Sequence, residues 1–428
     1  GLLTGPASAV VLGPHDAFAD LVPATAVSPR PIALQTSGTA TQPADATSAQ
    51  REALRRRLQA ALGGSTAVTV SAAVDVQGYG KVLRSEAGHP LPPASTQKNY
   101  VGVSALVALG PTARLRTEVA RRALPVNGRL DGDLWLVAGG DPYLTMLGLR
   151  ALARDVRAAG ITVVTGDVRL DDSRYDPRRT AAGWKPSFMP RQAGPLSAMA
   201  VDGNRWRTDQ AFLRDPAFPA AVRFRDFLRA EGVTVSGTVR RERRPAGAVT
   251  VAERVSGPIP AVVRRALKDS DNFAAELLLK EVGRVVRGDG SSAGGVTAMR
   301  DVLGRQAVPV GRSSDGSGLS ADNRQTTAGQ VLLLQAADSS GSGPQFRASL
   351  PVGCRDGTLR RRYCGTAADG RVTAKTGTLA GVRALSGYTR TASGREVQFA
   401  FLLTGVKDGG RALAAIDRAV VALAASTD

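Results

Sequence analysis

The chain has 428 residues, 43% of them hydrophobic, which is enough for two or three domains with sizeable cores. Two cysteines and two histidines cannot supply a four-ligand zinc site of the usual spacing, so we expect no metal and no cofactor. The net charge of +19 favours anionic partners, although an arginine bias in the coding sequence explains it equally well. Aromatic residues make up only 4% and the arginines are scattered, which argues against nucleic-acid binding.

The first 47 residues predict an export tail and a flexible linker. GLLTGPASAVVLG at the start resembles the end of an apolar export segment, with small residues at 7–9 as a cleavage site. Residues 10–47 are rich in Pro, Ala, Thr, Ser and Gly and have no periodic apolar pattern. We therefore expect an extracytoplasmic protein, secreted or associated with the cell envelope. No apolar stretch is long enough to span a membrane.

An amphipathic helix is predicted over 48–64, a β-hairpin over 67–86 and a second helix from about Ser95 to Leu109. Lys98 follows Ser95 by one helical turn on the same face, which brings its amine within reach of the serine hydroxyl. The Ser-x-x-Lys pattern by itself is weak, because about one chance occurrence is expected in a chain of this length. A capped helix with a surface lysine explains it as well.

A serine hydroxyl needs a base before it becomes a good nucleophile. Histidine is nearly excluded, since His15 lies in the tail and His89 lies in a proline-containing loop just before Ser95. Lys98 is the remaining candidate, and its amine must be neutral to accept a proton. Lowering a lysine pKa from about 10.4 towards 7 requires roughly 4–5 kcal/mol, which burial and a second positive charge can provide. Only seven of the 56 basic residues are lysines, which favours a chemical role for Lys98.

An internal repeat marks the middle of the chain. Residues 149–169 and 221–240 each contain a helix, a glycine stop, a strand and a glycine turn. Two copies are too few for a solenoid, so they predict an α/β subdomain inserted between about residues 113 and 252. The surrounding domain would then consist of residues 48–112 and 253–428.

Ser270-Asp271-Asn272 lies at a break between two helices predicted over 259–286. Loops held by helices commonly carry polar catalytic residues, although these residue types are also ordinary helix caps. In an acyl-transfer site, Ser270 would relay a proton between Lys98 and a leaving amine, and Asn272 would bind a substrate amide.

Cys354 and Cys364 are ten positions apart, which is too far for a redox pair, and no histidine lies near them. We favour a disulfide, which would indicate an oxidising compartment, over two reduced thiols.

Lys375, Thr376, Gly377 and Thr378 follow on a predicted strand. The lysine and the two hydroxyls would bind a substrate carboxylate, and the glycine would allow a ligand backbone to approach. Backbone N–H groups of Ser95 and Thr378 would form the oxyanion hole.

Two more strands, over 382–390 and 395–405, and a last helix over 409–425 complete the chain. With the early hairpin they predict an α/β (α+β) domain with a five-stranded antiparallel sheet, on one face of which the terminal helices pack together.

The motifs Ser-x-x-Lys, Ser-Asp-Asn and Lys-Thr-Gly stand in the order known from serine β-lactamases and penicillin-binding proteins. Beyond these short motifs, nearly the whole sequence after residue 50 resembles the low-molecular-mass class C penicillin-binding proteins, the D-alanyl-D-alanine carboxypeptidase/endopeptidase family. The segments that carry the resemblance are ASTQK (94–98), GGDPYL (139–144), SDNFAAE (270–276), DGSGLSADNR (315–324) and AKTGTL (374–379). The long step between Ser95 and Ser270 fits the large insertion characteristic of this family.

The resemblance implies a serine β-lactamase/transpeptidase-like fold and a serine-type D-Ala-D-Ala carboxypeptidase or endopeptidase. Its partners would be peptidoglycan stem peptides, which acylate Ser95, and penicillins, which inhibit it covalently. It also implies that Asp141 and Leu319 line the pocket for a stem-peptide side chain. The family often has arginine after Gly-Leu-Ser where this chain has Ala321, which leaves the side-chain preference open.

Two other functions are compatible with the sequence. A serine β-lactamase or related esterase would use the same acylation but needs a base for rapid deacylation, and no Glu-x-x-Leu-Asn element follows Ser-Asp-Asn. A non-catalytic basic module that binds wall polymer would explain the charge alone. Loose association with anionic wall polymer or a membrane surface fits either case.

Overall fold

The computed structural model describes residues 48–427. The predicted export tail and linker, residues 1–47, lie outside the described residues.

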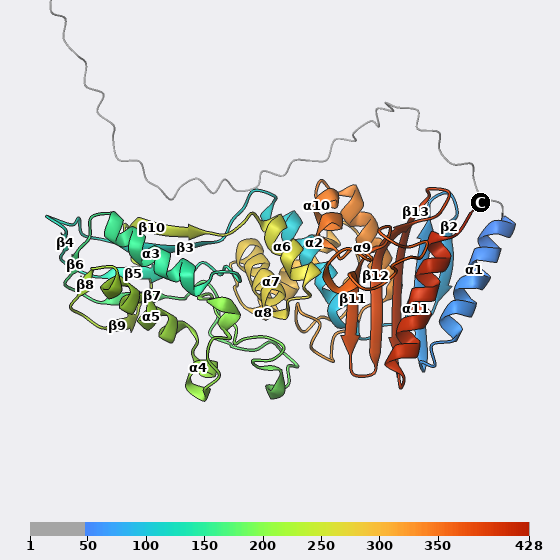
Figure 1. Cartoon of the computed structure of the whole chain (residues 1–428), viewed down its shortest axis with the longest axis horizontal. Helices are drawn as coiled ribbons and strands as arrows, with labels where there is room; N and C mark the ends of the chain where they lie inside the picture. The colour runs from blue at the N-terminus through green and yellow to red at the C-terminus, as the bar shows by residue number, and fades with distance from the viewer. Residues whose placement is uncertain (1–47, 428) are drawn as a thin grey trace, which may run out of the picture. The chain divides into compact units, whose positions relative to one another are not determined.

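Five strands form one antiparallel sheet in the order β11-β12-β13-β1-β2 (Figure 1). The first and last thirds of the chain meet in it, because β1 pairs with β13 along its whole length. The early hairpin and the three late strands were predicted to form this sheet, and that prediction is confirmed. The strands are β1 (Thr69–Val76), β2 (Gly80–Ser85), β11 (Thr373–Leu379), β12 (Val382–Arg390) and β13 (Glu396–Thr404).

Successive side chains along each strand point to opposite faces of the sheet, and helices cover both faces. Val74 and Phe399 pack in a core with the paired helices α1 and α11, as predicted for the terminal helices. Their neighbours Ala73 and Ala400 contact Val331 of α9 on the other face. These helices are α1 (Ser48–Gly63), α9 (Thr327–Ser339) and α11 (Gly409–Ala424).

A helical cluster beside the sheet holds the first two motifs. Its buried centre includes Tyr100 and Val103 of α2 and Leu278 and Leu279 of α7. The break predicted at Ser270 separates α6 from α7. The members are η1 (Ala94–Thr96), α2 (Gln97–Leu109), α6 (Ile259–Lys268), α7 (Asn272–Arg287), α8 (Ser292–Gly304) and α10 (Gly343–Ser349).

A second five-stranded sheet, in the order β10-β3-β5-β7-β9, is built from residues that fall between β2 and β11 in the chain. Its strands are β3 (Arg116–Arg121), β5 (Leu134–Val137), β7 (Val168–Asp171), β9 (Val239–Arg241) and β10 (Val249–Val255). The short strands β4 (Arg129–Leu130), β6 (Val163–Val164) and β8 (Thr234–Val235) form a parallel sheet beside it. The predicted subdomain limits at residues 113 and 252 stay a prediction.

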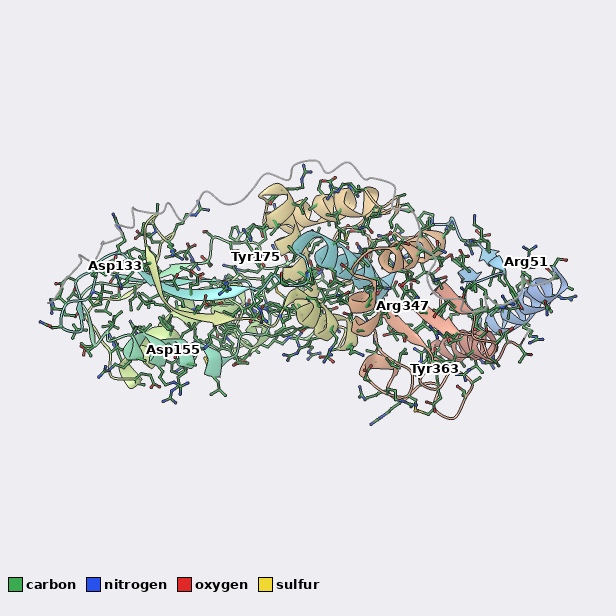
Figure 2. All side chains as sticks on the ribbon, turned by 90° about the horizontal axis from the view of Figure 1, so that it is seen from above. Arg51, Asp133, Asp155, Tyr175, Arg347 and Tyr363 are labelled. Atoms are coloured by element: carbon green, nitrogen blue, oxygen red, sulfur yellow. A yellow bond between two sulfur atoms is a disulfide. The ribbon has the colours of Figure 1, made fainter. Side chains whose placement is uncertain are left out.

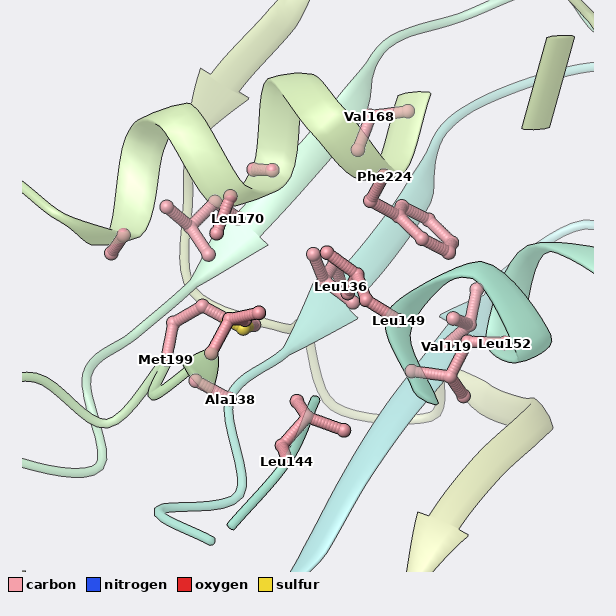
Figure 3. Packing of buried hydrophobic residues seen from close by; sticks show 14 of the residues in the cluster. Val119, Leu136, Ala138, Leu144, Leu149, Leu152, Val168, Leu170, Met199 and Phe224 are labelled. Carbon is pink, nitrogen blue, oxygen red and sulfur yellow. The ribbon is translucent and has the colours of Figure 1, made fainter. Parts of the chain in front are cut away.

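The internal repeat has a direct structural counterpart. Each copy is a helix followed by two short strands: α3 (Met146–Ala158) with β6 and β7, and α5 (Ala217–Ala230) with β8 and β9. The copies pair in parallel at equivalent positions, with Val168 opposite Val239. Figure 3 shows Leu149 of α3 and Phe224 of α5 packed into one core with Leu136 of β5.

Candidate active site

Ser95 and Lys98 lie where η1 runs into α2. The Lys98 side chain is fully buried, and its Nζ donates to Ser95 Oγ over 3.1 Å and to Asn272 Oδ1 over 2.7 Å. A third hydrogen bond goes to the carbonyl oxygen of Ser317. The amine is therefore held against the hydroxyl by acceptors from two other segments of the chain.

Burial lowers the pKa of Lys98 to about 8, because a charged amine loses hydration inside the protein. The negative charges of Asp315, Glu276 and Asp271 act in the opposite direction and keep the pKa from falling further. A lysine with this pKa supplies a useful fraction of neutral amine near neutral pH, which a general base requires.

Lys375 is a second fully buried lysine, placed by the edge strand β11. Its Nζ donates to Ser270 Oγ over 2.9 Å and to the carbonyl oxygen of Thr376 over 3.0 Å. Burial, together with the positive charge of Lys98, holds the pKa of Lys375 well below its usual range. Ser270 adopts a left-handed φ of 55° at the helix break, and its hydroxyl contacts Lys375 and not Lys98, the partner expected from the sequence.

Asn272 begins α7, and its amide bridges two segments of the chain. Oδ1 accepts from Lys98, and Nδ2 donates to the carbonyl oxygen of Gln192 over 2.9 Å. The sequence interpretation gave this amide to a substrate. In the structure its Oδ1 holds the Lys98 amine and the residue also lines the cavity described below, so its contact with a substrate stays a prediction.

Gly377 allows a close approach between two segments of the chain. A Cβ at this position would lie 2.9 Å from the carbonyl oxygen of Pro93 and 3.2 Å from Cβ of Ala94. These residues immediately precede Ser95, so the glycine lets β11 lie against the segment that carries the serine. The predicted room for a ligand backbone beside Gly377 stays a prediction.

Cys354 and Cys364 form a disulfide, with their Cα atoms 4.9 Å apart. The loop that it closes contains η4 (Gly357–Leu359). Thr358 of η4 accepts a 2.8 Å hydrogen bond from Thr376 Oγ1. The disulfide loop thus supports the strand that carries Lys375.

A cavity of about 770 Å³ opens over these groups. Ser95, Ser270, Asn272, Thr376 and Thr378 all line it. Lys98, Lys375 and Gly377 lie behind this lining. The three motifs, far apart in the chain, therefore converge on one cavity.

The two residues expected to bind a stem-peptide side chain lie in different places. Leu319 lines the cavity. Asp141 does not line it; its carboxylate accepts from the backbone N–H of Tyr143 over 2.9 Å. Burial raises the pKa of Asp141, against the opposing effects of the Tyr143 hydrogen bond and the charge of Arg265. The pocket role of Asp141 stays a prediction.

Two buried acids behind Lys98 were missed in the sequence. Asp315 accepts hydrogen bonds from the backbone N–H groups of Gly318 and Ser320 and from the Asn323 and Ser317 side chains. Glu276 accepts from the N–H groups of Gly316 and Ser317, so both acids shape the turn whose carbonyl holds Lys98. The sequence could have indicated both acids, because the motif segments SDNFAAE and DGSGLSADNR contain them.

Burial raises the pKa of Glu276 to about 8, and the nearby charge of Asp315 adds to this effect. The second carboxyl oxygen of Glu276 is buried and has no hydrogen-bond partner among the described residues. Both observations fit a carboxyl group that carries a proton at pH 7.

A long segment between β7 and α5 forms part of the site. Phe188 and Gln192 line the cavity, and Trp184 Nε1 donates to Asp315 over 2.9 Å. Periodicity could not reveal these contacts, because the segment has none.

Side chains at the start of the same segment form hydrogen bonds and ion pairs with α7. Arg174 forms a bidentate pair with Glu281, which also accepts from the hydroxyl of Tyr175, labelled in Figure 2. Asp176 pairs with Lys280, whose side chain is only 1% exposed. These contacts join the second sheet to the helix that carries Asn272.

Within residues 48–427, no group of three or more His, Cys, Asp or Glu side chains could hold a metal ion.

This fold, with a serine and two buried lysines at one cavity, defines a serine hydrolase of the penicillin-binding protein and β-lactamase class. The family model for the D-Ala-D-Ala carboxypeptidase 3 (S13) family matches residues 51–211 and 208–427. The chain belongs to this family, and it is a serine D-alanyl-D-alanine carboxypeptidase. The resemblance stated from the motifs is therefore confirmed.

Relatives of known name match most of the chain. A D-alanyl-D-alanine carboxypeptidase of Actinomadura sp. is 30% identical, over 88% of this chain and 85% of its own length. Carboxypeptidase DacB of Mycolicibacterium smegmatis is 31% identical, over 96% and 93%. The crystal structure of penicillin binding protein 4 from Haemophilus influenzae superposes with a TM-score of 0.77 at 21% identity, covering 85% of this chain and 97% of that one.

Proposed function

We propose that Ser95 is the nucleophile and Lys98 its general base in the cleavage of peptidoglycan stem peptides. Oγ attacks the carbonyl carbon of the penultimate D-alanine while Lys98 takes the hydroxyl proton. The C–N bond to the terminal residue breaks, and the leaving amine receives a proton. Water then hydrolyses the acyl-enzyme ester, which releases the shortened peptide and restores Ser95. The observation that carries the proposal is the buried Lys98 amine, 3.1 Å from Ser95 Oγ.

The other motif residues have supporting roles in this proposal. Lys375 provides positive charge for the terminal carboxylate, and Thr378 donates a hydroxyl hydrogen bond to it. Thr376 donates a second one when its hydroxyl turns from Thr358 to the ligand. Ser270, which accepts from Lys375, relays to the leaving amine the proton that Lys98 has taken, so that Lys98 is neutral again for the hydrolysis step. Backbone N–H groups of Ser95 and Thr378 stabilise the oxyanion.

β-Lactams would acylate the same serine, with ring opening in place of amine release. Support comes from related structures: the H. influenzae protein is described in complex with a β-lactam, and an endopeptidase of Bdellovibrio bacteriovorus as acylated by penicillin G. The latter superposes with a TM-score of 0.56.

The enzyme would act outside the cytoplasmic membrane, secreted or attached to the cell envelope. Its substrate class is a wall component, and the disulfide is of a kind that persists in oxidising compartments. In the described part of the chain, no helix is both long and apolar enough to cross a bilayer. The net charge of +19 would favour loose contact with anionic wall polymer.

D-Alanine release from a defined N-acylated peptide ending in D-Ala-D-Ala tests this proposal. We expect release by the wild type and a loss of about a thousandfold or more in Ser95→Ala. Release at an unchanged rate by Ser95→Ala would contradict it.

The lifetime of a fluorescent penicillin adduct separates this function from a β-lactamase. A carboxypeptidase keeps the adduct for minutes or longer, whereas turnover within seconds would favour the β-lactamase.

A further inference from the structure

The cavity beside Ser95 extends past the proposed carboxylate site to a cationic end. Arg383 and Lys407 line it there, next to the β11–β12 hairpin. Arg383 lies directly opposite Thr378 in the sheet, so both side chains lie on the same face. Lys407 follows β13, whose last residue Thr404 pairs with Val382, the neighbour of Arg383. The cationic end therefore adjoins the hydroxyl that would bind the terminal carboxylate.

Neither cation has a carboxylate partner among the described residues. Arg383 Nη1 donates to the carbonyl oxygens of Leu379 and Val382, over 3.3 and 2.9 Å, which leaves Nε and Nη2 available to a ligand. Lys407 is exposed, and no hydrogen bond or ion pair engages its amine in the part of the chain that the structure describes. None of the cavity-lining residues is an aspartate or a glutamate.

The acid nearest to these cations in the chain is already engaged. Asp408 caps α11 and accepts from the N–H groups of Gly410 and Arg411. An anion supplied by a ligand would meet two cations here that no carboxylate pairs with among the described residues.

The cavity is also larger than a single alanine requires. A volume of about 770 Å³ falls in the range of sites that enclose drug-sized ligands, whereas the leaving group of a carboxypeptidase is one small residue. The space beyond Thr378 is thus available to a larger leaving group.

We propose that Arg383 and Lys407 form a subsite for a second carboxylate, carried by the fragment that leaves when Ser95 is acylated. The preferred substrate class is then a peptide whose leaving fragment is extended and acidic, as in a cross-linked peptide that an endopeptidase cleaves. The inference deepens the proposed function and rests on it.

The experiment compares three N-acylated peptides with the same acyl part. Their leaving residues are D-alanine, D-norleucine and D-α-aminoadipate, so the last two differ by a side-chain carboxylate. We expect a kcat/KM ratio of aminoadipate to norleucine of about fivefold to tenfold, the contribution of two partly exposed ion pairs. In the double variant Arg383→Ala/Lys407→Ala this ratio should fall to about one. It should also fall to about one for the wild type in 1 M salt, because the Debye length there is only about 3 Å and exposed charges are screened from each other.

Lys81→Ala is the matched control. It removes one exposed positive charge from β2, at the opposite edge of the sheet from β11, and should keep the ratio. Lys407→Glu is the second variant, because this exposed side chain can be changed without loss of a hydrogen bond; its ratio should fall below that of Lys407→Ala.

A ratio near one in the wild type would overturn the subsite, as would a ratio retained in the double variant. Failure of the wild type to release D-alanine at all would instead refute the proposed function and, with it, the subsite.

Discussion

Lys98 combines properties that are rarely found in one lysine. Its amine is buried, it contacts a serine hydroxyl, and a side-chain amide and a backbone carbonyl fix its position. The sequence could predict the pair Ser95–Lys98 because spacing of three places both on one helical face. Periodicity could not single out Glu276 and Asp315 behind them, because buried acids that bind backbone N–H groups have no periodic signal; only the two motif segments that contain them pointed to these positions.

The pH dependence of acylation should follow the Lys98 amine. With a pKa of about 8, the neutral form increases as pH rises through 8, so kcat/KM for penicillin acylation should rise over that range and level off above it. Stopped-flow acylation from pH 6 to 10 measures this. A profile that is flat between pH 7 and 9 would contradict the assignment of Lys98 as the base.

Glu276→Gln should move this profile to lower pH. Glu276, with a pKa of about 8, raises the pKa of Lys98 once it ionises, and glutamine keeps an oxygen for the Gly316 and Ser317 N–H groups without that charge. Acylation at pH 8 should be faster than in wild type by up to about twofold, because about half of the amine is already neutral there. Glu253→Gln, at an exposed ion pair, is the control and should leave the profile in place. An unchanged profile would show that the Glu276 charge does not reach Lys98, and a shift to higher pH would contradict the sign of the effect.

At the scale of elements, the site lies where three separate pieces meet: the start of α2, the start of α7 and the edge strand β11. Propensity and alternation were sufficient to predict these elements. The loop between the two cysteines was not predicted to matter, since only the folded chain reveals that Thr358 supports Thr376.

Removing the disulfide should weaken both the fold and the site. On the chain-entropy model, Cys354→Ala/Cys364→Ala should lower the free energy of unfolding by about 2–3 kcal/mol. Because the loop supports β11, KM for the peptide should increase more than kcat changes. Urea unfolding and steady-state kinetics check the two effects. An unchanged unfolding free energy would mean that the loop is held by its other contacts alone.

At the scale of the whole molecule, ion pairs with buried partners connect the second sheet to the helices that carry the catalytic residues. Lys280 on α7 and Asp176 form a pair that neither segment predicts alone, because the partners are 104 positions apart. The internal sequence repeat predicted two copies of a helix-strand unit, and the structure confirms both copies. The long irregular segment that reaches the cavity carries no pattern and could be located only in the fold.

Asp176→Ala should therefore be strongly destabilising. It leaves the Lys280 charge buried and unpaired, at a cost of about 3 kcal/mol in the free energy of unfolding. Asp131→Ala removes the partner of Arg129 in an exposed pair and should cost less than about 1 kcal/mol. Urea titration of both variants measures the difference. Equal, small losses would mean that this contact does not couple the two parts.

The central claim is that Ser95 is acylated with Lys98 as the base. Incubation with benzylpenicillin, followed by mass spectrometry of the intact protein and its peptides, tests it most directly. We expect one antibiotic mass added to the wild type, on the peptide that contains Ser95, and no addition to Ser95→Ala or, at neutral pH, to folded Lys98→Ala. An adduct that persists in Ser95→Ala, or rapid labelling of Lys98→Ala, would contradict the account.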